Sequence, residues 1–193
     1  MCKVLLSAAV LLTFTACNGV GKLDEVGLRA FVQDEENGLK QLKTDGVFKV
    51  TATYRPSDLI AKQQMNGDQA AEFDSLANVY SRYTYFVVDI TKNGKDLETA
   101  LASEGSDVSS RINYLSSQFS EKFHVAVGNK LVPVTEFIYA RSYGITGSQF
   151  LIAFENIPMT DFQLLINGRE LGFNELTFDF EKDYIKRLPR LQF

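Results

Sequence analysis

Tyr83-Thr84-Tyr85-Phe86-Val87-Val88-Asp89-Ile90 is the segment of this 193-residue chain that most strongly indicates its fold. The run is almost continuously apolar and aromatic, whereas a strand with one solvated face alternates apolar and polar side chains. We therefore predict a central strand over 83–90 that is covered on both faces. Asn93-Gly94 predicts a turn shortly after it.

On the N-terminal side of this strand, the sequence predicts three helices and a second strand. Residues 47–55 alternate between apolar and polar, which is the pattern of a half-buried strand. Pro56 ends that strand, and Ser57 can cap a short helix through residue 64. Apolar residues three and four positions apart predict further helices over 24–34 and 68–81.

On the C-terminal side, one helix is followed by sheet. Apolar residues recur every three or four positions over 106–119, which predicts an amphipathic helix. Five more strands are predicted over 123–127, 130–141, 149–155, 161–166 and 174–181. Gly128-Asn129 predicts a tight hairpin between the first two. The fold expected is α+β: an antiparallel β-sandwich or curved sheet of about seven strands, with helices from the N-terminal two-thirds on one side.

The first sixteen residues have the pattern of a bacterial signal peptide. Lys3 precedes an apolar run that is too short for a permanent membrane helix, which needs roughly 20 apolar residues. Thr15-Ala16 directly precede Cys17, an arrangement that resembles a lipobox, although Phe14 stands where Leu is usual. We expect removal of residues 1–16 and acylation of Cys17. A plain secretory signal cleaved before Cys17 is the alternative.

This leader sets the expected domain organisation. Residues 1–16 form the lipoprotein signal peptide, 17–22 the lipidated cysteine and a short tether, and 23–193 a single globular domain. The tether extends no further than about 20 Å, so the domain stays close to the membrane. Cys2 is removed with the leader, so no intrachain disulfide is possible and stability depends on the core.

Charge argues against nucleic acid as a partner. Loss of Lys3 leaves 19 basic residues against 24 acidic ones, and nucleic-acid binding normally requires a basic face. Lys186, Arg187 and Arg190 form the one basic cluster, interleaved with Leu188 and Leu191. That cluster fits contact with anionic lipid headgroups, or a terminal edge strand whose charges discourage pairing. We favour the edge strand.

Catalytic and metal-binding patterns are sparse. His124 is the only histidine, and without a free mature cysteine, Cys/His catalysis and the common zinc sites are excluded. The segment from Asp89 to Gly94 begins like a calcium loop, but Ala100 occupies the position that needs a bidentate Glu. We expect no enzyme, no cofactor and no metal. A carboxylate pair for glycoside hydrolysis stays open, because its spacing exists only in three dimensions.

A Gly-flanked segment over 139–148 is the best candidate for a recognition loop. It carries Arg141 and Tyr143, and both residue types are enriched among interface anchors. A routine connection with its tyrosines packed inward is the alternative. The chain has no Trp, which argues against a glycan-binding platform, although its 8 Tyr could substitute.

Several short segments carry a family resemblance. Glu36-Asn37-Gly38-Leu39, residues 54–60, Asp183-Tyr184-Ile185 and Leu188-Pro189-Arg190-Leu191 resemble a group of small uncharacterised outer-membrane lipoproteins of Bacteroidota-type bacteria. The resemblance implies a lipid-anchored protein of the outer membrane, facing the periplasm or the cell surface. It implies no catalytic activity.

Three hypotheses of function follow. The first is a non-enzymatic envelope lipoprotein, anchored through lipid on Cys17, that holds a protein partner as an accessory part of a secretion or envelope assembly. The second is a surface lipoprotein that binds a glycan or another small ligand. A hydrolase that uses carboxylates comes third.

Overall fold

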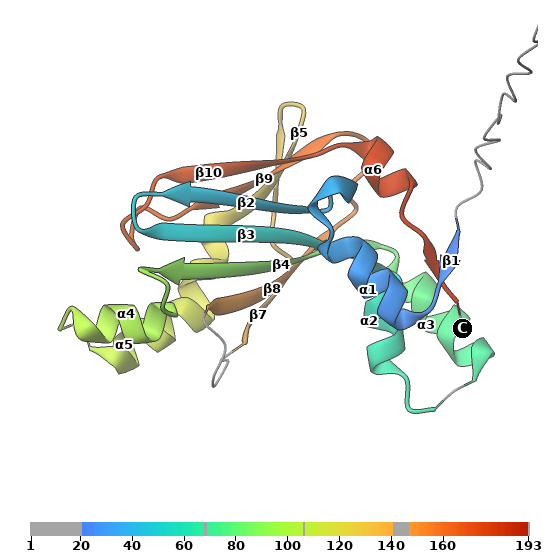
Figure 1. The fold of residues 1–193 in the computed structure, drawn as a ribbon, viewed down its shortest axis with the longest axis horizontal. Coiled ribbons are helices and arrows are strands. Elements are labelled where there is room, and N and C mark those ends of the chain that lie inside the picture. The colour runs from blue at the N-terminus through green and yellow to red at the C-terminus, as the bar shows by residue number, and fades with distance from the viewer. Residues whose placement is uncertain (1–20, 68, 106, 141–146, 193) are drawn as a thin grey trace, which may run out of the picture.

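The computed structural model describes residues 21–67, 69–105, 107–140 and 147–192. Within these ranges the protein has six α-helices and eleven strands, and two of its sheets are antiparallel and packed face to face (Figure 1). This confirms the expected α+β class and sandwich-like architecture. No helix in these ranges is long and apolar enough to span a bilayer.

The larger sheet has five strands, and the predicted central strand lies in its middle. The strand order, from one edge to the other, is β2 (Lys40–Asp45), β3 (Phe48–Arg55), β4 (Tyr83–Lys92), β8 (Ser148–Glu155) and β7 (Glu136–Ala140). Gly46 and Gly94 adopt positive φ in the turns that follow β2 and β4, which is a conformation that glycine tolerates.

The smaller sheet has four strands and covers the inner face of the larger one. Its order is β10 (Glu175–Phe180), β9 (Phe162–Asn167), β5 (Phe123–Val127) and β6 (Lys130–Pro133). As predicted, Gly128-Asn129 joins β5 to β6 in a two-residue hairpin. A separate parallel pair joins the two ends of the domain, because β1 (Lys22–Leu23) lies beside β11 (Arg190–Leu191).

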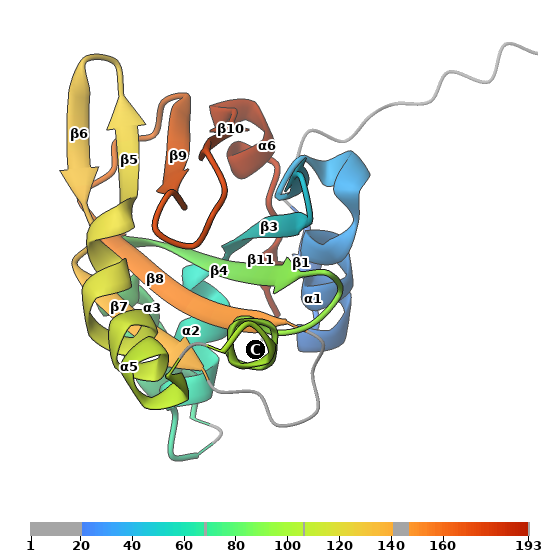
Figure 2. The same cartoon turned by 90° about the vertical axis from the view of Figure 1, so that its left-hand side faces the viewer.

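The first five helices lie at the ends and on the outer side of the large sheet, and the last lies beside the end of β10 (Figures 1 and 2). They are α1 (Glu25–Gln33), α2 (Ser57–Gln64), α3 (Ala70–Tyr80), α4 (Leu97–Ser103), α5 (Val108–Asn113) and α6 (Lys182–Lys186). In Figure 1, α4 and α5 lie beneath one end of the sheet, and α1 to α3 beneath the other. No helix of the described chain crosses beneath the middle of the sheet.

The core between the sheets is aromatic. Phe86 in β4 is fully buried at its centre and contacts Tyr54, Phe154, Phe162 and Phe180, with ring centroids 5.0–6.1 Å apart. Side chains two positions apart in a strand share a face, so the even-numbered residues of β4 supply this core.

The edges β2 and β10 meet on one side of the sandwich. Gln41 donates a hydrogen bond to the backbone oxygen of Asp179, and the backbone N–H of Asn174 donates to Asp45, 2.6 Å between N and Oδ2. Lys43 lies over the ring of Phe178, 5.6 Å from its centroid. Both edges are therefore covered, which limits pairing with other chains.

A second cluster of buried apolar residues lies outside the sandwich. Leu28 of α1, Leu59 of α2, Phe73 of α3 and Leu191 of β11 pack together there. This cluster holds α1 to α3 and both ends of the domain against one end of the large sheet. The chain therefore enters and leaves the domain at the same place.

The structure corrects several sequence-based expectations. The predicted strand 130–141 is two strands in different sheets, because Pro133 ends β6 and the chain crosses to begin β7 at Glu136. Ser57 does not cap α2, since Pro56 occupies the cap position without a side-chain bond. Lys22, assigned to the tether, forms part of β1.

Further differences concern helices and an additional strand. The predicted helix 106–119 begins as α5, widens into a π-helical turn over Tyr114–Gln118 and ends in a 3-10 helix over Phe119–Lys122. The widened turn leaves Leu115 and Phe119 in the core while Val108 is exposed. Sequence reasoning missed β2, α4 and α6.

Candidate functional site

The candidate site is the open face, defined as the outward side chains of the large sheet between the two groups of helices. The strand register arranges these side chains in rows across the sheet. One row is Lys40, Thr53, Val87, Leu151 and Ile138. The flanking rows are Arg55, Tyr85, Ala153 and Glu136 on one side, and Leu42, Thr51, Asp89, Gln149 and Ala140 on the other.

An apolar cavity, here the tyrosine pocket, occupies the part of the open face next to α2 and α3. Its volume is about 330 Å³, and Tyr85, Leu151 and Ala153 of the sheet line it together with Tyr80 of α3. Tyr85 lies 6.5 Å from Tyr80 and 6.0 Å from Tyr83, measured between ring centroids. Its side chain is 7% exposed, and burial raises its pKa to about 12. The tyrosine is therefore neutral at physiological pH.

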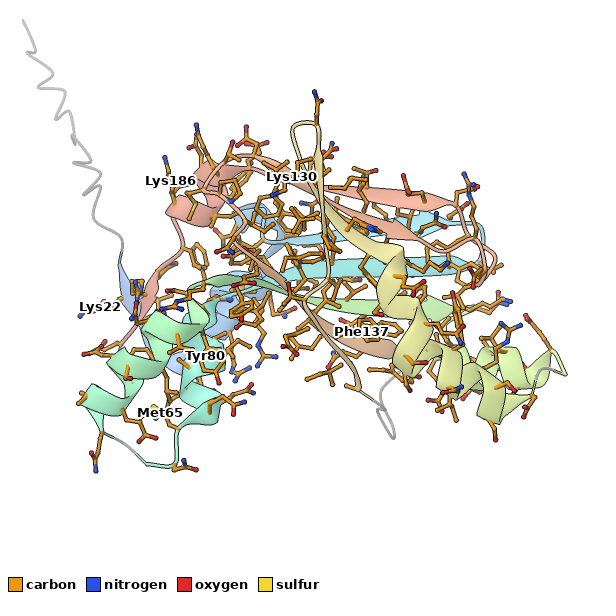
Figure 3. The ribbon with its side chains drawn as sticks, turned by 180° about the vertical axis from the view of Figure 1, so that it is seen from behind. Lys22, Met65, Tyr80, Lys130, Phe137 and Lys186 are labelled. Carbon is orange, nitrogen blue, oxygen red and sulfur yellow. The ribbon has the colours of Figure 1, made fainter. Side chains whose placement is uncertain are left out.

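The rim of the tyrosine pocket carries exposed apolar side chains. Ile138 on the edge strand β7 is 56% exposed, and Val79 on α3 is 48% exposed. Figure 3 shows Tyr80 on the helix that flanks the sheet. An apolar cavity with an exposed apolar rim is the pattern of an interaction site.

A second cavity, here the arginine pocket, lies on the open face next to α1. Its volume is about 360 Å³, and Arg29, Gln33, Arg55 and Gln149 are among its lining side chains. The two pockets share no lining residue but are neighbours on the sheet, because Arg55 is paired directly with Tyr85 in the strand register, and Val87 with Leu151. One open face therefore offers an apolar end and a polar end.

Asp89 is the one carboxylate that lines the arginine pocket among the described residues. Burial raises the pKa of this carboxyl above its ordinary value, although Gln149, which donates a hydrogen bond of 2.9 Å, and Lys40 oppose the shift. A single carboxylate does not supply the acid and base pair that glycoside hydrolysis requires. The described residues also contain no group of three or more possible metal ligands among His, Cys, Asp and Glu.

Substitution of Asp89 by Asn tests this electrostatic account. Because the pKa is raised on folding, the folded state holds the proton more tightly, and stability falls as the pH rises from the ordinary 3.8 through the raised value. Asn does not ionise, so Asp89→Asn abolishes this fall in stability with rising pH. We expect a higher midpoint of thermal unfolding than wild type near pH 7 and an unchanged midpoint near pH 3. If the variant and the wild type unfold at the same temperature near pH 7 as well as near pH 3, burial does not raise the pKa of Asp89.

Some of the residues singled out from the sequence lie in the described part of the chain, and others lie outside it. Cys17, Arg141 and Tyr143 lie outside the described residues, so their predicted roles stay predictions. The two described ends of the recognition segment pack inward: Tyr139 stacks on Phe150, 5.0 Å between ring centroids, and Ser148 is buried. The Tyr139 hydroxyl donates to Glu98, 2.7 Å between oxygens.

His124 and the segment that begins like a calcium loop both lie in regular structure. His124 is in β5, in the sheet opposite the open face, and its side chain is partly buried. Asn93-Gly94 forms the predicted turn, with both residues at positive φ, and Asp89 lies within β4 rather than in a loop. The residues from Asp89 to Gly94 are thus a strand and a turn.

Sequence reasoning missed Arg55, Tyr85 and Ile138 as site residues. Their strands were predicted, but a single sequence does not show which outward faces the helices leave open. One signal was present in the sequence. Val87 and Leu151 are apolar at positions that face away from the core, which is unusual for a solvated sheet face.

The likeness of this chain to known proteins is distant. No family model and no curated protein sequence matches the chain. A crystal structure of a DUF4426 family protein from Pseudomonas aeruginosa is similar over 74% of this chain and 91% of that chain, with 14% sequence identity and a TM-score of 0.34. A likeness of this degree carries no functional argument.

Proposed function

We propose that the protein is a non-enzymatic, lipid-anchored lipoprotein of the outer membrane that holds a protein partner. The open face of the large sheet binds an extended segment of that partner, and the tyrosine pocket receives one of its apolar side chains. The anchor is the lipid on Cys17. The protein would act as an accessory part of a secretion or envelope assembly. Its resemblance to outer-membrane lipoproteins of Bacteroidota-type bacteria supports the location.

The observation that carries this proposal is the tyrosine pocket with its exposed rim. A cavity of about 330 Å³ is at the small end for a ligand site and suits one or two side chains of a peptide. Ile138 and Val79 extend the apolar surface beyond the cavity, where the neighbouring residues of an extended segment would lie. A partner that covers this apolar surface removes it from water, which contributes favourable free energy to binding.

The same tyrosines argue against a glycan as the ligand. Sugar-binding platforms present a flat aromatic face to solvent, whereas these rings pack on one another at interplanar angles of 58° and 43°. Tyr85, between the other two, is buried. The described surface of the tyrosine pocket therefore fits an aliphatic or aromatic side chain better than a sugar ring.

The position of the chain ends supports membrane anchoring on one side of the domain. Lys22, five positions after Cys17, pairs with Arg190 in the β1–β11 ladder. Figure 3 shows Lys22 and Lys186 at the same end of the molecule. In the alternative in which the basic cluster contacts anionic headgroups, basic side chains at this end favour the same orientation as the anchor.

Replacement of Cys17 tests the anchor. The wild-type mature chain should partition into the detergent phase and carry acyl chains on Cys17, because several chains together bind a bilayer stably. Cys17→Ala should give a soluble or unprocessed protein with an unchanged far-ultraviolet circular dichroism spectrum. Phase partition and the intact mass measure this. An unmodified Cys17 in the mature wild-type protein would contradict the lipoprotein assignment.

Two matched substitutions test the binding face. Ile138 and Leu131 are both exposed, at 56% and 58%, but Leu131 lies on β6 of the other sheet. Ile138→Asp places a charge on the rim and should weaken partner capture from detergent-solubilised envelopes by about 1–3 kcal/mol, whereas Leu131→Asp should not. Both variants should fold, since exposed substitutions usually change stability by no more than about 0.5 kcal/mol. Equal capture by the two variants would refute the proposed face.

Arg141 and Tyr143 remain part of this proposal as predicted contacts. They follow Ala140, the last residue of β7, directly in the sequence. The edge strand that carries Ile138 therefore leads into them.

A further inference from the structure

Two arginines converge on the arginine pocket from different elements. Arg29 projects from α1 and Arg55 from the end of β3, and both line the cavity together with the side-chain amides of Gln33 and Gln149. The Nη2 of Arg55 donates to Gln63 of α2, 2.7 Å from its Oε1. This bond positions the guanidinium but leaves its charge in place, because the amide acceptor is neutral.

Arg29 and Arg55 lie close enough in the pocket for their like charges to act on each other. Burial lowers the pKa of Arg55, and the positive charge of Arg29 lowers it further. A bound anion would offset this repulsion between the two guanidinium groups. Arg29 directs its Nε and Nη2 to a single oxygen of Glu25, an exposed pair one helical turn away. Such exposed pairs stabilise weakly, and a guanidinium has five donors, so Arg29 can bind a second acceptor. Asp89 lies in the same pocket, where Lys40 is the cation that lowers its pKa.

We infer that the arginine pocket binds a carboxylate side chain, Asp or Glu, of the partner's segment. This inference rests on the proposed function and adds the chemistry of the partner to it: an acidic residue close in sequence to an apolar one. Planar carboxylates match the paired N–H donors of arginine, which favours this group over a neutral side chain.

The geometry of the open face relates the acidic and apolar residues. Arg55 and Tyr85 are direct neighbours in the strand register, so the arginine pocket and the tyrosine pocket adjoin. In an extended peptide, side chains two positions apart share a face and are about 7 Å apart. A segment with its acidic and apolar residues two or four positions apart can therefore occupy both pockets at once.

Selection from random peptides tests this inference while the partner is still unidentified. The full chain, purified in detergent and immobilised, is exposed to a phage library of random peptides displayed through their C-termini, so that only side-chain carboxylates are offered. Wild type should enrich peptides that combine an acidic residue with a nearby apolar or aromatic one. Arg29→Gln and Arg55→Gln should each enrich the apolar residue without the acidic one.

The outcomes separate the two proposals. If wild type enriches apolar residues with no preference for acids, the carboxylate subsite is overturned and the proposed face stands. If wild type enriches no sequence, the proposed function fails and this inference fails with it. Arg169→Gln removes the same charge from the loop after β9, where Arg169 is exposed, and should select the wild-type consensus.

Affinities of one selected peptide complete the test. Replacement of its acidic residue by the matching amide should weaken binding to wild type about tenfold, as expected for the loss of a charge-assisted hydrogen bond. With Arg55→Gln, the two peptides should bind equally. A persistent preference for the acid in that variant would overturn the assignment to Arg55. Arg29→Gln on the exposed face of α1 gives a second variant should Arg55→Gln fail to fold.

Discussion

Phe86→Ala should reduce the free energy of unfolding by about 3–5 kcal/mol, which is much of the stability of an ordinary domain. Phe86 is fully buried, and its ring contacts four other aromatic rings from both sheets. Truncation removes these contacts and leaves a cavity in the middle of the sandwich, where strands on both sides limit collapse. Urea unfolding followed by circular dichroism measures the loss.

The control for this substitution is Leu131→Ala, which shortens an exposed side chain on β6. It should change stability by no more than about 0.5 kcal/mol. The slope of the unfolding transition with urea should be similar in both variants, because the surface exposed on unfolding hardly changes. A loss below about 1 kcal/mol for Phe86→Ala would mean that the aromatic core is not packed as described.

Asp58→Ala should have the second largest effect, a loss of about 2–3 kcal/mol. The buried carboxylate of Asp58 accepts from the Nε of Arg190 at 2.8 Å and from the backbone N–H of Leu191 at 3.0 Å. Asp58 thus holds β11 against α2, and β1 is held there through its pairing with β11. Without this contact the Leu191 N–H stays buried without its partner, a cost that adds to the lost charge-assisted bonds.

Asp58→Ala should loosen the C-terminal segment locally as well as lower the stability of the whole domain. Limited proteolysis of Asp58→Ala should cleave the C-terminal segment faster than in wild type, because β11 loses its attachment. Asp74→Ala on the exposed face of α3 is the control, and it should leave both stability and cleavage unchanged. If the two variants behave alike, the role of Asp58 at the chain ends is wrong.

Much of the sheet could be predicted because its signals are local. Alternation over 47–55 and the continuous apolar run over 83–90 predicted β3 and β4, and both turns with Gly were found where expected. β2 was missed because its outward and inward side chains are mostly polar, Leu42 being exposed and Lys43 lying over Phe178. Its position depends on pairing with β3 and not on its own pattern.

The division of the predicted strand 130–141 shows a different limit. Apolar residues lie on both sides of Thr135-Glu136, so the apolar pattern by itself gives little reason to divide the segment. The break becomes necessary only in three dimensions, because β6 pairs with β5 in one sheet and β7 pairs with β8 in the other. Pro133 was the local sign, as it has no N–H for a ladder.

The candidate site was harder to predict for the same reason. Arg29 and Arg55 are 26 positions apart in the sequence, and nothing local connects them. Tyr80 and Tyr85 were assigned to a helix and a strand, but their contact depends on how α3 lies on the sheet. Tyr139, expected to open a recognition loop, packs on the core through Phe150, because strand alternation directs it inward.

Site-specific photo-cross-linking in living cells shows whether the open face holds a partner segment. A benzophenone side chain replaces Ile138 on the open face or, as the control, Leu131 on β6 of the other sheet. After irradiation, Ile138 should give a discrete adduct of higher mass that disappears when Val79→Asp is introduced on the opposite rim, and Leu131 should give none. An adduct from Leu131 alone, or none from Ile138 in cells that produce the folded, membrane-bound protein, would contradict the claim.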